Sequence, residues 1–124
     1  MALRSEVKHL TIDVVGAVGE FAITQEDGQR LYDLIHPALR EGRMVVVDFT
    51  GIRVLASPFL NMAFGQLLED IPYDRVDRLL VKKGLSAHDT ELLERIMVNA
   101  REYYENPDAR RAIDTAIANA AEES

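Results

Sequence analysis

Residues 44–52, M-V-V-V-D-F-T-G-I, together with A-S-P-F-L at 56–60, are the stretch that decides the fold of this chain. A run of apolar residues that ends in Asp48 and a glycine turn predicts a short strand buried on both faces. Ser57 and Pro58 then begin a segment whose apolar residues recur at helical spacing. Serine is a favoured helix N-cap, and proline suits the first helical position. The stretch therefore predicts a strand, a turn and a helix, with one hydroxyl at the positive end of that helix.

The length of 124 residues predicts a single domain spanning 1–124, with a disordered end at residues 1–5. The chain has no apolar run that could cross a bilayer, and its first residues lack the apolar core of a signal peptide. It also contains no cysteine, so disulfides, thiolate metal sites and thiol catalysis are excluded. Together these observations predict a cytoplasmic protein.

The formal net charge of −7 argues against two classes of partner. An acidic chain without a cluster of basic residues is repelled by nucleic-acid phosphates and by anionic membranes. We therefore expect neither a nucleic acid nor a membrane as the partner of this protein.

Turn signals and hydrophobic periodicity predict alternating strands and helices. The first half gives a strand at residues 7–15, a short second strand at 20–23 that forms a hairpin with it, and a helix at 24–42. Pro37 is expected to kink that helix or to split off its last turn. The second half gives a strand at 43–49, a loop at 50–56, a helix at 57–70, a strand at 76–82 and a helix at 86–104. A last helix at 108–122, within a peripheral segment 106–124, completes the chain.

This order of elements is typical of crossover connections between parallel strands, so it predicts an α/β fold with a partly parallel sheet. In such folds the carboxyl ends of the strands, near helix N-termini, are the usual place for a functional site. The turn before Ser57 occupies one of these places.

The sequence gives little support to an enzyme. A nucleophilic serine needs a base and a group that orients the base, and none of His9, His36 or His88 belongs to a recognisable triad motif. Neither a metal-binding H-E-x-x-H pattern nor a phosphate-binding glycine-rich loop is present. We therefore expect no catalytic residues, no metal site and no cofactor.

The segments V-V-V-D-F-T-G-I and A-S-P-F-L-N-M-A-F-G-Q-L-L, with the preceding T-Q-E-D-G-Q-R-L-Y-D-L-I, resemble a known family. They resemble the STAS-like domains of unknown function found in bacterial and archaeal proteins, which are distant relatives of the STAS domains of anti-sigma-factor antagonists. The resemblance covers roughly residues 10–105. It implies a STAS-like mixed sheet of about four strands with helices packed on one side, acting as a regulatory module in prokaryotic signalling through protein–protein contact.

In the antagonists, a partner kinase that resembles histidine-kinase ATPases phosphorylates a serine at the start of the helix after the central strand. By position, the resemblance places that serine at Ser57. The antagonist motif has an aspartate before the serine and Ser-Gly after it, whereas this chain has Ala56, Pro58 and Phe59. Ser57 is thus interpreted either as a phosphorylation switch or as a plain helix cap.

We expect a non-enzymatic module that binds a partner protein, such as a histidine-kinase-like ATPase, as a monomer or a homodimer. Its predicted binding surface consists of Asp48, Thr50, Gly51, Arg53, Ser57 and Asn61. The alternative is a domain that senses a small molecule or nucleotide in a pocket at the strand end near Asp48 and Ser57. A small hydrolase is the residual alternative, and it requires a histidine close to Ser57.

Overall fold

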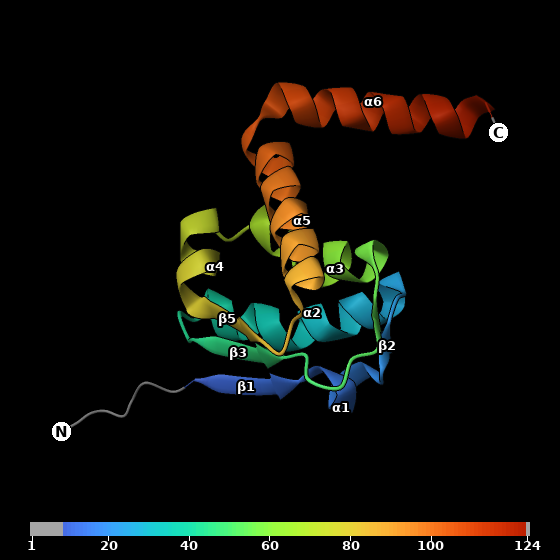
Figure 1. Ribbon diagram of the computed structural model, residues 1–124. Coiled ribbons are helices and arrows are strands. Elements are labelled where there is room, and N and C mark those ends of the chain that lie inside the picture. Colours follow the sequence, from blue (N-terminus) through green and yellow to red (C-terminus); the bar gives the residue numbers. More distant parts are fainter. Residues whose placement is uncertain (1–8, 124) are drawn as a thin grey trace.

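The computed structural model describes residues 9–123, except for the side chains of residues 107, 109, 110 and 119–123 (Figure 1). The predicted loose end at residues 1–5 lies outside the described residues. The elements in chain order are β1 (Leu10–Asp13), α1 (Val14–Val18), β2 (Phe21–Ala22), α2 (Gln25–Arg40), β3 (Val45–Asp48), β4 (Val54–Leu55), α3 (Ser57–Ala63), the 3₁₀ helix η2 (Gly65–Glu69), α4 (Tyr73–Leu79), β5 (Leu80–Lys83), α5 (Ala87–Glu105) and α6 (Pro107–Glu123). The predicted α/β class is confirmed.

The main sheet has three parallel strands in the order β1-β3-β5. Side chains on one face, such as Ile12, Val45 and Leu80, are buried. Helices α2, α3 and α5 lie on one side of this sheet (Figure 1). On the other face Thr11 and Val81 are exposed. The expectation that β3 is buried on both faces is therefore wrong, because helices cover only one side of the sheet.

A second, two-stranded sheet pairs β2 with β4 in parallel. The predicted hairpin between the first two strands is therefore wrong, since Val14 and Val15 start helix α1 and β2 joins a different sheet. The predicted loop at residues 50–56 likewise contains β4. All strand pairs among the described residues are parallel rather than mixed.

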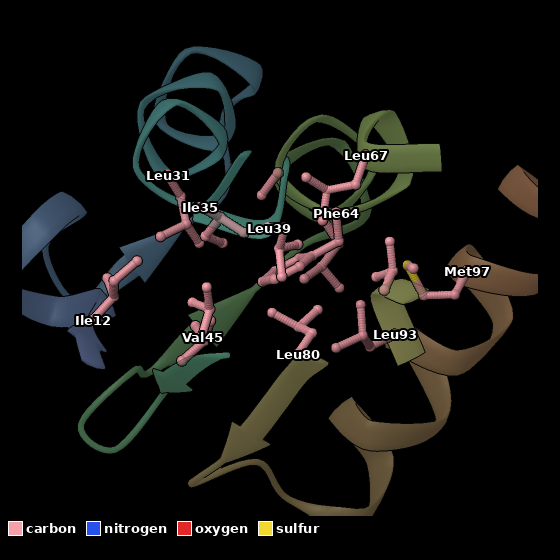
Figure 2. Packing of buried hydrophobic residues seen from close by; sticks show 14 of the residues in the cluster. Ile12, Leu31, Ile35, Leu39, Val45, Phe64, Leu67, Leu80, Leu93 and Met97 are labelled. Carbon is pink, nitrogen blue, oxygen red and sulfur yellow. The ribbon is translucent and has the colours of Figure 1, made fainter. Parts of the chain in front are cut away.

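The hydrophobic core lies between the main sheet and the helices that cover it. Figure 2 shows Ile12, Val45 and Leu80 on the side of the strands that faces α2, and Leu93 and Met97 reaching the same core from α5. Each large apolar side chain buried there contributes about 1.5–3 kcal/mol relative to its exposed state. This packing fixes α3, and hence the turn that precedes it, against the sheet.

Helix α2 begins as predicted, with the hydroxyl of Thr24 accepting the main-chain N–H of Asp27 at 3.1 Å. Pro37 does not split off the last turn, and the helix continues to Arg40. Proline removes only the hydrogen bond to the carbonyl four residues earlier, and its own carbonyl still accepts the amide of Glu41 at 3.1 Å.

Two boundaries in the middle of the chain differ from the prediction. The helix predicted to run from Ser57 to Asp70 changes to a 3₁₀ helix after Ala63. The strand predicted at residues 76–82 begins only at Leu80, because Tyr73–Leu79 form α4. Residues 73, 76 and 79 recur at helical spacing, and this period prevails over the alternation that predicted a strand.

The last two helices match the prediction closely. The hydroxyl of Ser86 caps α5 by accepting the amide of Asp89 at 3.1 Å. Helix α6 leaves the end of α5 and extends away from the rest of the molecule in Figure 1. Its Ile113 and Ile117 side chains are exposed.

Candidate functional site

The turn after β3 is a compact polar structure. Oδ1 of Asp48 accepts the main-chain N–H of Thr50 at 3.0 Å, which is the usual way that aspartate stabilises a turn. Hydrogen bonds from the hydroxyl and the amide of Thr50, with a smaller contribution from the Lys83 cation, lower the pKa of Asp48 below its ordinary value. The carboxylate is therefore held charged by the turn.

A glycine of the neighbouring strand end supports this turn. A Cβ atom on Gly84 would lie only 2.6 Å from the Thr50 nitrogen and 3.0 Å from Oδ1 of Asp48, so only glycine permits this approach. Gly51 has a φ of +93°, and a Cβ atom there would lie 3.2 Å from a methyl carbon of Val15. The sequence analysis identified Asp48, Thr50 and Gly51 but missed Gly84, because its role depends on the pairing of β3 with β5.

Arg53 belongs to a different part of the surface. Its main-chain N–H donates to the Glu20 carbonyl at 2.8 Å, and its guanidinium lies 3.5 Å from a Glu20 carboxylate oxygen. The guanidinium carbon also lies 6.0 Å from the centre of the Phe21 ring. Arg53 thus joins β2 rather than the Asp48 turn.

An exposed apolar patch lies beside Arg53 on the second sheet. Phe21 and Val54 are register partners in the second sheet, with 52% and 43% of their surface exposed, and Ile23 is 41% exposed. We call Phe21, Ile23 and Val54 the Phe21 patch. The sequence analysis missed it, because strands of two residues are too short to show a period.

Ser57 and Asn61 belong to α3, the helix that follows β4 in the chain. The amide of Ala56 donates to the Ala22 carbonyl at 3.0 Å, and this bond ties the start of α3 to β2. Ser57 and Asn61 are both exposed and lie one helical turn apart. In Figure 1, β2 and α3 lie on the same side of the molecule.

The capping role assigned to Ser57 is wrong. Ala56 is the N-cap, with extended backbone angles, and its carbonyl accepts the amide of Leu60 at 3.2 Å. Ser57 is the first helical residue, so its hydroxyl does not occupy the N-cap position. The predicted cap is thus one residue too late, and the phosphorylation interpretation of Ser57 stays a prediction.

A cavity of about 370 Å³ lies elsewhere, between α4, β5 and α5. None of the predicted surface residues lines it; its nearest approach to the Asp48 turn is at Lys83 and Gly84. The small-molecule pocket predicted near Asp48 and Ser57 therefore does not coincide with this cavity.

The sequence analysis also missed a polar cluster at the end of α2. Nε2 of His36 lies 2.9 Å from Oδ1 of Asp70, and Arg40 donates to Oδ2 of the same carboxylate at 2.6 Å. The ring of Tyr32 stacks on His36 with centroids 4.8 Å apart. Partial burial works to raise the pKa of Asp70, but the hydrogen bonds from His36 and Arg40 outweigh it and lower the pKa.

This cluster is a link between α2 and the segment after η2. Burial raises the pKa of Tyr32, with a further rise from the negative charge of Asp70. Within the cluster, Nε2 of His36 lies at hydrogen-bond distance from both carboxylate oxygens of Asp70, and the cluster contains no serine, threonine or cysteine nucleophile. The arrangement joins α2 to the segment that follows η2.

Within residues 9–123 no helix is long and apolar enough to cross a membrane. In the same part of the chain, no three His, Asp or Glu side chains gather as metal ligands would.

Comparison with family models identifies the family of this chain. The model of a STAS-like domain of unknown function matches residues 27–90, which include most of α2 and the whole of β3, the Asp48 turn, α3 and β5. No curated protein and no solved structure matches the chain. Since the match covers more than half of the 124 residues, the chain belongs to the family of STAS-like domains of unknown function.

Proposed function

We propose that this protein is a non-enzymatic regulatory module that binds a partner protein through the Phe21 patch and the adjoining start of α3. The observation that carries the proposal is the exposure of Phe21 and Val54 side by side on a short sheet. Large apolar side chains left in water at one place are typical of interaction surfaces.

The composition of the surface supports the same proposal. Aromatic residues and arginine are enriched at the energetic centres of protein interfaces, and here Arg53 lies against Phe21. The salt bridge between Arg53 and Glu20 is exposed, so it contributes little to stability and leaves Arg53 available to a partner.

Ser57 is the residue through which this surface would be regulated. Its side chain is exposed, it begins α3 one residue after the end of β4, and it is not the N-cap of that helix. A phosphate there would add up to two negative charges beside the Phe21 patch and would oppose the docking of an apolar or acidic partner. A histidine-kinase-like ATPase is the partner class that the resemblance suggests.

Affinity capture from the source cytoplasm tests the binding surface. The baits are the wild type, Phe21→Asp and Leu34→Asp; Leu34 is 46% exposed but lies on α2, outside the patch. We expect one partner to be retained by the wild type and Leu34→Asp and lost with Phe21→Asp. Equal retention by all three baits would contradict the proposed surface.

The proposed regulation through Ser57 is tested with two further baits. We expect Ser57→Asp to lose the same partner that Ser57→Ala retains, and the intact mass of the wild type isolated from its host to show a phosphate-sized increase that Ser57→Ala lacks. Retention of the partner by both variants would leave the Phe21 patch as an unregulated binding surface.

A further inference from the structure

The outer edge of the main sheet, formed by β5, leaves main-chain groups unpaired. The Lys83 carbonyl accepts the amide of Phe49 at 2.8 Å, so the main chain of Lys83 faces β3. Successive residues of a strand turn their N–H and C=O groups to opposite edges. The N–H and C=O of Lys82 therefore face outward, where no strand of the described chain pairs with β5.

The cavity of about 370 Å³ lies directly beside this edge. Its walls include the buried side chains of Val76, Leu80, Leu93 and Met97, and Val98, which is 56% exposed, stands at its rim. A volume of this size is within the range of ligand sites, and its walls are suited to aliphatic side chains.

The side chain of Lys82 places a positive charge beside this cavity. Residues two apart in a strand point to the same face, so Lys82 lies on the face of Leu80, and both line the cavity. Within the described part of the chain no carboxylate pairs with Lys82. Asp77 and Glu94 also line the cavity, but from the helices rather than from the strand.

We propose that this edge binds an extended peptide segment of another protein as an added strand. The peptide places an aliphatic side chain beside Leu80 and an acidic side chain beside Lys82, two positions apart, because directly opposed residues of paired strands share a face. The free main-chain groups of Lys82 supply the hydrogen bonds. The β5 edge and the Phe21 patch are separate surfaces, so a negative result at one of them does not contradict binding at the other.

A peptide is favoured over the other occupants of such an edge. A small apolar molecule would fill the cavity but would leave the outward N–H and C=O of Lys82 unused. A second copy pairing through β5 would bring Lys82 and Lys83 of both copies together, and lysines at an edge oppose such self-pairing. A carboxylate on the incoming strand relieves this repulsion.

Selection from a library of random heptapeptides displayed on phage tests the proposal with the full chain as target. We expect the selected peptides to share an aliphatic and an acidic residue two positions apart. In NMR spectra of the wild type, the synthetic form of the strongest peptide should shift the amides of Lys82 and Val98. Failure to select a peptide, or shifts confined to other elements, would overturn the proposal.

N-methylation of the peptide separates strand addition from binding by side chains alone. Methylating the amides that face β5 removes the donors and clashes with the edge, whereas methylating the alternate amides leaves the pairing intact. We expect the first set to abolish binding and the second to preserve it. Equal affinity of the two sets would show that side chains alone bind the peptide and would refute strand addition.

A charge reversal tests the role of Lys82. Lys82→Glu should weaken the acidic peptide roughly fivefold or more, and a peptide with lysine in place of the acid should recover affinity for this variant. Val98→Glu should also weaken binding, whereas Leu34→Glu, at another exposed apolar position on α2, serves as the control and should not. Unchanged affinity in Lys82→Glu would contradict the proposed pairing.

Discussion

Gly28 of α2 lies against the main chain of Phe59 in α3: a Cβ atom on Gly28 would stand 2.5 Å from the Phe59 carbonyl oxygen. The same atom would lie 2.9 Å from Cβ of Met62, so α3 would have to move to make room. The close crossing of α2 and α3 therefore depends on the absence of a side chain at residue 28, and α3 carries Ser57 and Asn61 at its exposed face.

Gly28→Ala is expected to destabilise the protein, although alanine is the better helix former by about 1 kcal/mol. Overpacking at a buried contact costs roughly 1–3 kcal/mol, and this exceeds the gain in helix propensity. Urea unfolding measures the change. Arg30→Ala, at an exposed position of the same helix, is the control and should change the unfolding free energy by less than about 0.5 kcal/mol. A more stable Gly28→Ala protein would contradict the close crossing.

Replacing Ser57 and Ser86 by alanine should have different effects on stability. The Ser86 hydroxyl accepts the amide of Asp89, so Ser86→Ala should cost about 1 kcal/mol. Ser57 is an exposed first helical residue and not the N-cap, so Ser57→Ala should stay within about 0.5 kcal/mol of the wild type. Thermal or urea unfolding of the two variants decides this. Equal losses would mean that Ser57 caps α3 after all.

Local signals in the sequence predicted much of this fold. Ser86 and Thr24, each with an acid three residues later, located the starts of α5 and α2. The apolar run before Asp48 located β3. These elements are specified by neighbours within a few residues, which is why a sequence pattern can find them.

The differences between the predicted and the observed helices and strands depend on contacts between segments that are distant in the sequence. Val14 and Val15 continue the apolar pattern of β1, yet β3 pairs with β1 only as far as Asp13, and the chain then turns into α1. Residues 76–79 fit both a helix and a strand, and the packing of Val76 in the core selects the helix. Sequence patterns alone do not distinguish between such alternatives.

In the candidate site, too, the residues that depend on local contacts could be predicted, and those that depend on distant contacts could not. Asp48 and Thr50 form one local turn, and the sequence analysis identified both residues. Phe21, Val54 and Gly84 acquire their roles only when β2 meets β4 and β5 meets β3. Their positions beside one another could not be predicted without the topology of the two sheets.

The stability that Asp70 provides should depend on pH in a defined direction. The pKa of Asp70 is lower in the folded protein than its ordinary value of about 4, so folding favours the charged form. The resulting stability is present above about pH 4 and is lost as the pH falls through the lower, folded-state pKa. Because the side chain is 38% exposed, we expect no more than about 1 kcal/mol from its ion pairs.

Asp70→Asn tests this dependence. Its unfolding free energy should lie below that of the wild type at pH 7, and the difference should shrink toward pH 3. Asp77→Asn, in exposed α4, is the control and should follow the wild type at both pH values. A difference between wild type and Asp70→Asn that grows as the pH falls would contradict the assigned direction.

The pKa of Asp48 reports directly on the turn at the end of β3. The Thr50 hydroxyl is the largest cause of its lowered pKa, followed by the Thr50 amide, so Thr50→Val should raise the pKa toward its ordinary value without restoring it fully. A carbon-detected NMR titration of the Asp48 carboxyl measures this change. Thr115→Val, on the exposed surface of α6, should leave the titration unchanged.

Because the folded-state pKa of Asp48 is the lower one, the carboxylate stabilises the turn above about pH 4 and ceases to do so as acid protonates it. An Asp48 pKa that is the same in Thr50→Val and in the wild type would show that the hydroxyl does not hold the charge, and the turn would then rest on the amide of Thr50 and on Lys83 alone.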